Sequence, residues 1–313
     1  MLTRRHIRAK VMQSVYAFVQ SGRDNVETEQ KNMLTSIDKI YDLYILMLNL
    51  LIEVAEWDKA IVENRNRRLN IPEEELALSE VLAYNRFTVK LSQNKTLLTA
   101  TEDMRIGWSD KDEYLQILVK EIKESELFKR YQKRDKYTFK SDKNFMIDVF
   151  KDIIAPNEKI HEYIEGENIS WLGDMSVANS MTHKTLTHVF EDSSDDETLM
   201  SLYKDNEDKE FAKSLFVKTV MKSEELTKLI SEKTPGWDSD RIAQLDLIMM
   251  QMAVCEFLNF PSIPTKVSIN EYLELSKDFS TPKSKVFING VLDKLWRDLD
   301  RENAIKKSGR GLV

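Results

Sequence analysis

Turn-forming residues are scarce in this chain of 313 residues, which contains only eight glycines and six prolines. Both residues interrupt helices, so their scarcity favours long helices with few connections. Charged residues make up 32% of the sequence, as is common in chains built from amphipathic helices. We therefore predict an all-α protein, with a length that suits one large domain or two ordinary ones.

Cysteine and long apolar runs are also lacking. The single cysteine, Cys255, excludes a disulfide framework and a thiolate cluster for zinc. Because Cys255 lies within an apolar stretch, we expect an inert buried thiol. No run of 18 apolar residues is present, and the first residues lead into no signal-type apolar segment. These absences predict a soluble, cytoplasmic protein without a membrane contact.

Sequence patterns of common catalytic sites are missing as well. The chain has no Gly-rich phosphate-binding motif and no nucleophile elbow. His161 and Glu162 resemble the start of a zinc-protease helix, but Glu165 stands where that pattern needs its second histidine. The acidic run 191–197 lacks the glycine and terminal glutamate of a calcium-binding EF-hand. We predict that the protein is not an enzyme and holds neither a metal nor a cofactor.

Apolar residues recur at helical spacing through most of the chain. This periodicity predicts helices over residues 26–63, from about 73, over 110–134, in two parts over 138–165, over 198–204, over 211–233 and over 241–260. Between residues 84 and 98 we expect a loop with short helical turns. The helix over 241–260 is apolar on nearly all sides, so we expect it to be buried all round.

Two more helices are predicted to begin at prolines. Pro264 and Pro282 each open a helical pattern, and the first turn of a helix tolerates proline because its N–H has no partner there. Gly290 lies inside the last of these helices, at a cost of about 1 kcal/mol relative to alanine. We therefore expect a neighbouring backbone to pass close to Gly290.

Positive charge is concentrated at the N-terminus. The first 20 residues contain no acidic residue and four basic ones, namely Arg4, Arg5, Arg8 and Lys10. Cations at a helix start are disfavoured by the helix dipole, so their placement indicates an anionic partner, unless it is an ordinary solvated helix end. Negative charge is concentrated in residues 191–210, which carry nine acids and two lysines, and the net charge of the chain is −7.

The C-terminal third carries an ordered motif. It includes Trp237, residues 240–242, the sequence INE at 269–271, ELSK at 274–277 and FINGVLD at 287–293. This string resembles the C-terminal half of the NusB family of transcription antitermination factors, and residues 1–22 resemble the family's arginine-rich first helix. The resemblance implies a non-catalytic helical bundle that binds the boxA segment of ribosomal RNA operon transcripts. It also implies the ribosomal protein NusE and the RNA polymerase elongation complex as partners.

The resemblance also implies site residues. On the first helix and around FINGVLD, the expected RNA-binding residues are Arg4, Arg5, Arg8, Lys10, Tyr16, Lys283, Lys285 and Phe287. Arginine grips phosphates and stacks on bases, and aromatic rings stack on unpaired bases; Tyr16 and Phe287 would otherwise be ordinary core aromatics. The residues expected to contact NusE are Glu256, Glu271 and Glu274.

The chain is about twice as long as a typical member of the family. We predict a basic first helix in residues 1–25, a helical insertion in 26–204, the core of the NusB-like bundle in 205–300 and a disordered basic tail in 301–313. The alternative is a helical protein-interaction adaptor of the transcription machinery that has lost RNA binding, which the acidic segment favours. The sequence leaves open the role of the insertion and whether the chain forms a homodimer.

Overall fold

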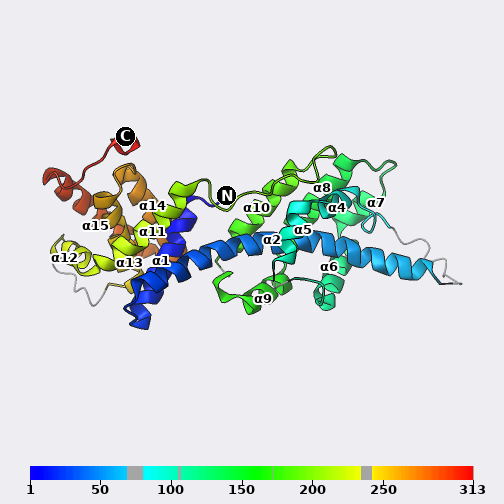
Figure 1. The fold of residues 1–313 in the computed structure, drawn as a ribbon, viewed down its shortest axis with the longest axis horizontal. Coiled ribbons are helices and arrows are strands. Elements are labelled where there is room, and N and C mark those ends of the chain that lie inside the picture. Colours follow the sequence, from blue (N-terminus) through cyan, green and yellow to red (C-terminus); the bar gives the residue numbers. More distant parts are fainter. Residues whose placement is uncertain (69–79, 105–106, 172, 234–241, 313) are drawn as a thin grey trace. The chain divides into compact units, whose positions relative to one another are not determined.

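The computed structural model describes residues 1–312 except 69–79, 105–106, 172 and 234–241. The described residues form helices and no strand, which confirms the predicted all-α class (Figure 1). Contacts divide the chain into two units. Unit 1 consists of residue 1 and residues 38–202, and unit 2 consists of residues 2–37 and 203–313.

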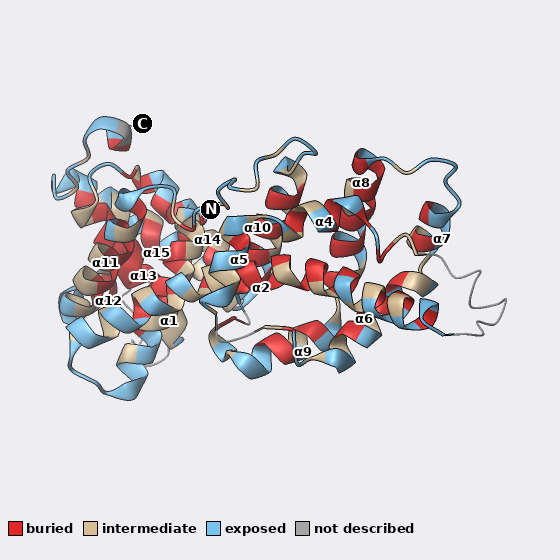
Figure 2. Ribbon diagram, turned by 45° about the vertical axis from the view of Figure 1, so that its right-hand side comes forward, coloured by how far each residue is buried: buried red, intermediate tan, exposed pale blue. Residues whose placement is uncertain are grey.

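Unit 2 is a bundle around one buried helix. Its helices are α1 (Arg4–Ser21), the first turns of α2 (Val26–Asn66), α11 (Asn206–Met221), α12 (Ser223–Lys233), α13 (Gln244–Asn259), α14 (Thr265–Phe279) and α15 (Pro282–Arg301). Helix α13 packs against α1, α11, α12, α14 and α15. Every residue from Ile248 to Phe257 is buried, as expected for a helix that is apolar on nearly all sides (Figure 2).

The predicted helix starts are confirmed by their caps. The hydroxyl of Thr281 accepts a hydrogen bond from the backbone N–H of Ser284 at 3.2 Å, and Pro282 occupies the first helical position of α15. Pro264 is the N-cap of α14. In α1 the cap is Thr3, whose hydroxyl accepts from the backbone N–H of His6.

Gly290 does not have the neighbour that we expected. It is exposed in the middle of α15, and a Cβ atom built on it would meet no atom within 4 Å. Packing therefore does not require glycine here. Replacement of Gly290 by alanine is expected to raise the free energy of unfolding by about 1 kcal/mol, the difference in helix propensity. Urea unfolding measures this, and a loss of stability would contradict it.

Cys255 is fully buried on α13, as predicted. Burial raises the pKa of its thiol to about 11. Only the thiolate is nucleophilic, so the native protein should react with a thiol-specific dye only as fast as it opens. We expect negligible labelling over minutes at pH 7.5 and complete labelling in denaturant. Rapid labelling of the folded protein would contradict this arrangement of α13.

Unit 1 is built on the longer part of α2. Its other helices are α4 (Arg86–Ser92), α5 (Lys95–Glu102), α6 (Asp112–Glu124), α7 (Glu126–Gln132), α8 (Phe139–Val149), α9 (Glu158–Glu167) and α10 (Met175–His188). A π-helical turn, Phe150–Ile154, continues α8, and a 3-10 turn, Ile169–Trp171, precedes α10. In both views α4, α5 and α10 lie on one side of α2, and α6 and α9 lie on the other (Figures 1 and 2).

Three hydrogen bonds of buried side chains fix the surrounding elements to α2. The indole N–H groups of Trp108 and Trp171 donate to the backbone carbonyls of Leu46 and Lys39, at 2.9 and 2.8 Å. The hydroxyl groups of Tyr44 and Thr185 are 2.6 Å apart. Each of these groups is buried and hydrogen-bonded, so the contacts specify where the surrounding elements pack.

Several predicted elements differ from the structure. The helix expected over 110–134 is interrupted at Ser125, whose hydroxyl caps α7. The helix expected over 198–204 is absent, and residues 189–205 instead follow an irregular path. Two lysines hold that acidic segment, with Lys90 on Asp195 at 2.8 Å and Lys95 on Asp196 at 3.0 Å. The helix expected from about residue 73 lies outside the described residues.

The ends of the bundle also differ from the predicted division. The two contact units meet within α2 at residues 37–38 and again at 202–203, whereas the sequence analysis divided the chain after residues 25 and 204. The tail that we predicted to be disordered contains a 3-10 turn, Gly309–Leu312. The ammonium group of Lys307 donates to the carbonyls of Glu256 and Phe260, at 3.1 and 3.0 Å, and so caps the end of α13.

Candidate nucleic-acid interface

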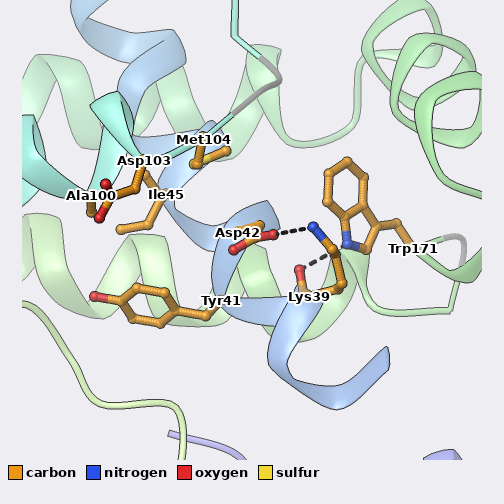
Figure 3. Close-up of a pocket in the computed structure, with 8 residues that line it drawn as sticks. All are labelled: Lys39, Tyr41, Asp42, Ile45, Ala100, Asp103, Met104 and Trp171. Carbon is orange, nitrogen blue, oxygen red and sulfur yellow. Dashed lines mark hydrogen bonds and ion pairs between the residues drawn. The ribbon is translucent and has the colours of Figure 1, made fainter. Parts of the chain in front are cut away.

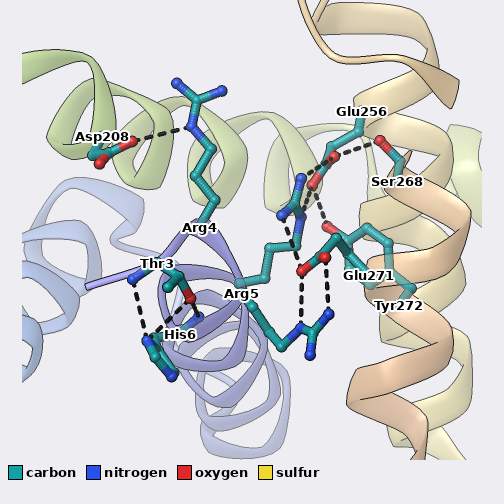
Figure 4. A network of polar contacts seen from close by, with 10 residues as sticks. Thr3, Arg4, Arg5, His6, Asp208, Glu256, Ser268, Glu271 and Tyr272 are labelled. Carbon is teal, nitrogen blue, oxygen red and sulfur yellow. Dashed lines mark hydrogen bonds and ion pairs between the residues drawn. The ribbon is translucent and has the colours of Figure 1, made fainter. Parts of the chain in front are cut away.

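The basic residues of the N-terminus lie on α1, where α11, α13 and α14 surround it. Figure 4 shows the polar contacts that this arrangement creates. Residues Ile7, Val11, Met12 and Val15 form the buried side of α1. Arg8 occupies the same side, because it precedes Val11, Met12 and Val15 by three, four and seven positions.

Arg8 forms a buried ion pair with Glu256 of α13. Its Nε and Nη2 donate to the two carboxylate oxygens at 2.7 and 2.8 Å. The hydroxyl groups of Ser268 and Tyr272, both on α14, donate to the same carboxylate at 2.6 and 2.7 Å (Figure 4). Four short hydrogen bonds therefore satisfy one carboxylate, and they join α1, α13 and α14 at one point.

Aromatic rings and charge surround the guanidinium of Arg8. It lies over the rings of Phe211 and Tyr272, with its central carbon 5.2 and 5.8 Å from their centroids. Burial alone would lower the pKa of Arg8, but the charge of Glu256 raises it above the ordinary value. Burial, and then the negative charge of Glu256, raise the pKa of Tyr272. The arginine stays charged and the tyrosine stays neutral, as the pair requires.

Three of the predicted contact residues lie in the interior and need correction. Arg8, Lys10 and Glu256 are 2%, 3% and 0% exposed. Arg8 and Glu256 bind each other, and the ammonium group of Lys10 lies 3.5 Å from the hydroxyl of Ser36. Neither RNA nor a partner protein can touch these groups in this structure. Their charges hold the bundle together instead.

Arg4 and Arg5, by contrast, reach the surface. Arg5 donates through Nε and Nη2 to both oxygens of Glu271, each at 3.0 Å. Arg4 donates to Asp208 of α11 at 3.0 Å and lies 3.7 Å from Glu207. Both guanidinium groups are partly exposed, and Glu271, which we predicted at a partner surface, serves as a ligand for Arg5. The carboxylates fix the direction of each arginine without covering it.

The predicted residues of α15 lie on the surface near its start. Lys283 is exposed, Lys285 and Phe287 are partly exposed, and Val286 between them is strongly exposed. Tyr16, on the later turns of α1, is also exposed. These positions suit contact with a ligand.

Basic residues of both α1 and α15 influence the carboxylate of Glu274. A hydrogen bond from Lys277 lowers the pKa of Glu274, and the positive charges of Lys277, Arg5 and Lys285 lower it further. The charges of Arg5 and Lys285 therefore both act on the same exposed carboxylate of α14. Arg5 also pairs directly with Glu271, which precedes Glu274 by three residues on the same face of α14.

A recess of about 600 Å³ adjoins the start of α1. Thr3, Arg4 and Arg5 line it on one side, and Pro264 and Val267 of α14 line it on the other. The first turn of α14 has no acidic residue and no side-chain cap. Glu271, which pairs with Arg5, also lines the recess, so a helix start without an acid and two arginines meet one carboxylate there.

Unit 1 contains a recess of its own, about 380 Å³ in volume (Figure 3). Tyr41, Ile45 and Trp171 contribute its apolar part, and Lys39 pairs with Asp42 at 2.7 Å at its edge. Across the described residues, no three histidine, cysteine or acidic side chains are placed to share a metal ion. In that same part of the chain, no helix is long and apolar enough to cross a membrane.

Sequence reasoning missed the residues that complete the network, namely Asp208, Phe211, Ser268 and Tyr272. A signal for two of them was present. Ser268 and Tyr272 are four residues apart on one helix face, so their hydroxyl groups point in the same direction. Glu256 lies in a helix that we expected to be buried all round, so its carboxylate needs hydrogen-bond donors from neighbouring helices. Nothing in the sequence pattern indicated Asp208, because it is one of nine acids between residues 191 and 210.

Comparisons with known proteins agree with the motif. The chain is 40% identical over 103 residues to the transcription antitermination protein NusB of Salinibacter ruber, 44% over 96 residues to that of Koribacter versatilis, and 34% over 103 residues to that of Chloroherpeton thalassium. These matches cover 33%, 31% and 33% of the chain, and 64%, 66% and 49% of the three relatives, so the chain spans less than two thirds of each.

No solved structure matches the chain significantly. The motif residues Trp237, Asp240 and Arg241 lie outside the described residues, whereas the stretch from INE to FINGVLD forms α14 and the first half of α15. The model of the NusB family matches residues 172–297, a range that contains this stretch. This part of the chain is a NusB family domain.

Proposed function

We propose that the chain is a non-catalytic, RNA-binding transcription antitermination factor. It binds boxA-type RNA of ribosomal RNA operon transcripts together with the ribosomal protein NusE, within the elongation complex of RNA polymerase. This proposal rests on the exposure of two arginines at the start of α1. Arg4 and Arg5 reach the surface at the start of a helix that the Arg8–Glu256 pair clamps into a NusB family domain.

The geometry supports phosphate binding by Arg4 and Arg5. Arg5 is paired with Glu271, and Arg4 with Asp208 and Glu207, yet both side chains remain partly exposed, and a guanidinium has five N–H donors. An arginine held in this way loses little side-chain entropy when a phosphate binds to its remaining donors. Lys283 and Lys285 add charge, and Tyr16 and Phe287 supply rings whose stacking contributes roughly 1–3 kcal/mol per base.

Of the three glutamates predicted to contact NusE, two are engaged by arginines of α1. Glu256 is buried, and Glu271 is engaged by Arg5. Glu274 is left as the proposed contact, because its carboxylate lies at the surface of α14 beside Lys277. RNA binding by Arg5 and partner binding by Glu274 would then take place on the same side of the bundle.

Fluorescence anisotropy with a labelled boxA-type RNA tests the proposal. The protein is titrated at two salt concentrations, with and without NusE. We expect binding that tightens with NusE and weakens with salt, because phosphate contacts release counterions. Absence of binding in every condition by a folded protein would favour the adaptor, and residues 38–202 would then be the first place to look for its partner.

A further inference from the structure

Unit 1 carries a basic segment that the family resemblance does not explain. Residues 129–140 contain six basic residues, Lys129, Arg130, Lys133, Arg134, Lys136 and Lys140, and one acidic residue, Asp135. Their net charge is +5, in a chain whose total charge is −7. Such a reversal of sign over 12 residues creates a local field that attracts anions.

All six basic side chains are exposed. They come from α7, from the connection that follows it and from the first turn of α8, and we call this set the α7–α8 surface. Lys129 pairs with Glu126, three residues earlier. Among the described residues, Lys133, Arg134, Lys136 and Lys140 pair with no carboxylate.

Several other lysines of unit 1 do pair with a carboxylate. Lys59 pairs with Glu56, Lys159 with Glu162, and Lys90 with Asp195. Those pairs neutralise charge locally, as solvated helix faces usually do. The α7–α8 surface is therefore set apart by its unpaired cations as well as by its composition.

Contacts of two tyrosines, Tyr131 and Tyr137, fix the connection between α7 and α8. The ring of Tyr131 stacks on Phe145, with centroids 4.0 Å apart and planes 4° apart, and its hydroxyl donates to Asp142 at 2.7 Å. The hydroxyl of Tyr137 donates to the carbonyl of Gln132 at 2.9 Å. A surface held in this way presents its cations in a fixed pattern, which lowers the entropy lost on binding.

Arg86 of α4 supports the same connection. Its Nη1 donates to the carbonyl of Tyr137 at 2.9 Å, and its side chain is exposed, so it adds a further cation to the edge of the surface. Thr138 and Ser141 form a capping box at the start of α8. Three separate elements thus converge on the α7–α8 surface.

A recess of about 200 Å³ opens within this surface. It is lined by Leu127, Arg130, Tyr131, Arg134, Asn144 and Asp148. Arg130 belongs to α7 and Arg134 to the connection that follows it, and α8 contributes the amide of Asn144 and the carboxylate of Asp148. Guanidinium planes accept the face of a base, and the amide and carboxylate can hydrogen-bond to its edge, whereas the ring of Tyr131 is buried against Phe145 and forms the floor of the recess.

We propose that the α7–α8 surface is a second RNA-binding site, which holds the phosphates of single-stranded RNA largely without reading their sequence. The choice of RNA rests on the proposed function of the NusB family domain. A membrane surface is disfavoured because residues 126–148 expose no large apolar side chain for insertion. The arginine-lined recess favours a nucleotide over an acidic peptide.

The test uses the full chain and a labelled single-stranded RNA of about 16 nucleotides that lacks boxA. The test variant replaces Lys133, Arg134, Lys136 and Lys140 by glutamine. The control variant replaces four other exposed lysines of unit 1 by glutamine, namely Lys120, Lys151, Lys159 and Lys184. Both variants change the net charge equally, so a difference between them reports the position of the charges.

We expect the test variant to bind this RNA at least tenfold more weakly than the control variant. Each lost phosphate contact should reduce the slope of log K against log salt by about 0.7, or about 2–3 for four contacts. Equal binding by the two variants would overturn the proposal. Binding to anionic vesicles that depends on these four residues, without such binding to RNA, would overturn it too. Circular dichroism and urea unfolding serve to check that both variants are folded.

A third variant separates this proposal from the proposed function. Arg4→Gln with Arg5→Gln removes the surface cations of α1 and should leave binding of the unrelated RNA within about twofold. If the unaltered protein binds boxA-type RNA no more tightly than the unrelated RNA, and both depend on the α7–α8 surface but not on Arg4 and Arg5, the proposed function is wrong and the second site stands. If the unrelated RNA depends only on α1, the second site is wrong.

Discussion

Replacement of Glu256 by alanine is expected to lower the free energy of unfolding of unit 2 by about 3–5 kcal/mol. The substitution leaves the guanidinium of Arg8 buried without its counter-charge, and it removes the acceptor for the hydroxyl groups of Ser268 and Tyr272. An uncompensated buried charge costs far more than a lost surface ion pair. Urea unfolding, followed by circular dichroism, measures the loss.

The matched control is Glu274→Ala on the neighbouring helix. Glu274 is a partly exposed glutamate whose ion pair with Lys277 contributes little, so the change should be within about 0.5 kcal/mol. A second comparison removes both charges, with Arg8→Met and Glu256→Leu combined. Because apolar side chains of similar volume often replace a buried pair at no cost, this variant should regain the part of the loss that comes from the unpaired charge, whereas the hydroxyl groups of Ser268 and Tyr272 stay without their acceptor. A Glu256→Ala variant as stable as the unaltered protein would contradict the buried network.

The double substitution Arg4→Gln with Arg5→Gln is expected to weaken binding of boxA-type RNA by about a hundredfold. Hydrogen bonds to charged groups contribute at least about 1.5 kcal/mol each, and 1.4 kcal/mol corresponds to a factor of ten in affinity. The salt slope should fall by about 1.4, since two phosphate contacts are lost. Fluorescence anisotropy at several salt concentrations measures both quantities.

Arg8 must be kept in this experiment. A variant that also lacks Arg8 would leave Glu256 buried and unpaired, and loss of RNA binding could then be loss of the fold. The control is Arg23→Gln, which removes an exposed arginine of unit 2 that pairs with Glu29. Unchanged RNA affinity in the double variant, with normal unfolding, would show that Arg4 and Arg5 are not the RNA contacts.

The fold was largely predictable from local patterns. Scarce glycine and proline indicated helices, and the prolines at 264 and 282 marked two helix starts because only a first turn accepts that residue. The prediction of a helix over 198–204 was wrong although four of its seven residues are apolar, because the segment is short and the residues before it are tied to Lys90 and Lys95 in an irregular path. Short segments are decided by such tertiary contacts more than by propensity.

The site was less predictable, because composition does not reveal whether a charge faces solvent or a partner. Arg8 shares a helix turn with Arg4 and Arg5, yet its spacing to Val11 and Val15 puts it on the buried side. Glu256 lies in a helix that we expected to be buried all round, and that expectation already required a cation for it. The pairing itself joins residues far apart in sequence, which periodicity does not encode.

That distance has a consequence for the order of folding during synthesis. Arg8 and Glu256 are 248 residues apart in the chain, and the residues of unit 1 are synthesised between them. Domains generally fold as units while the chain emerges, and long-range contacts form late because loop closure must come first. Helix α1 is therefore made first but docks only after α13 and α14 have left the ribosome. Until then the nascent protein carries an undocked basic helix, and its arginines acquire their fixed directions only near the end of translation.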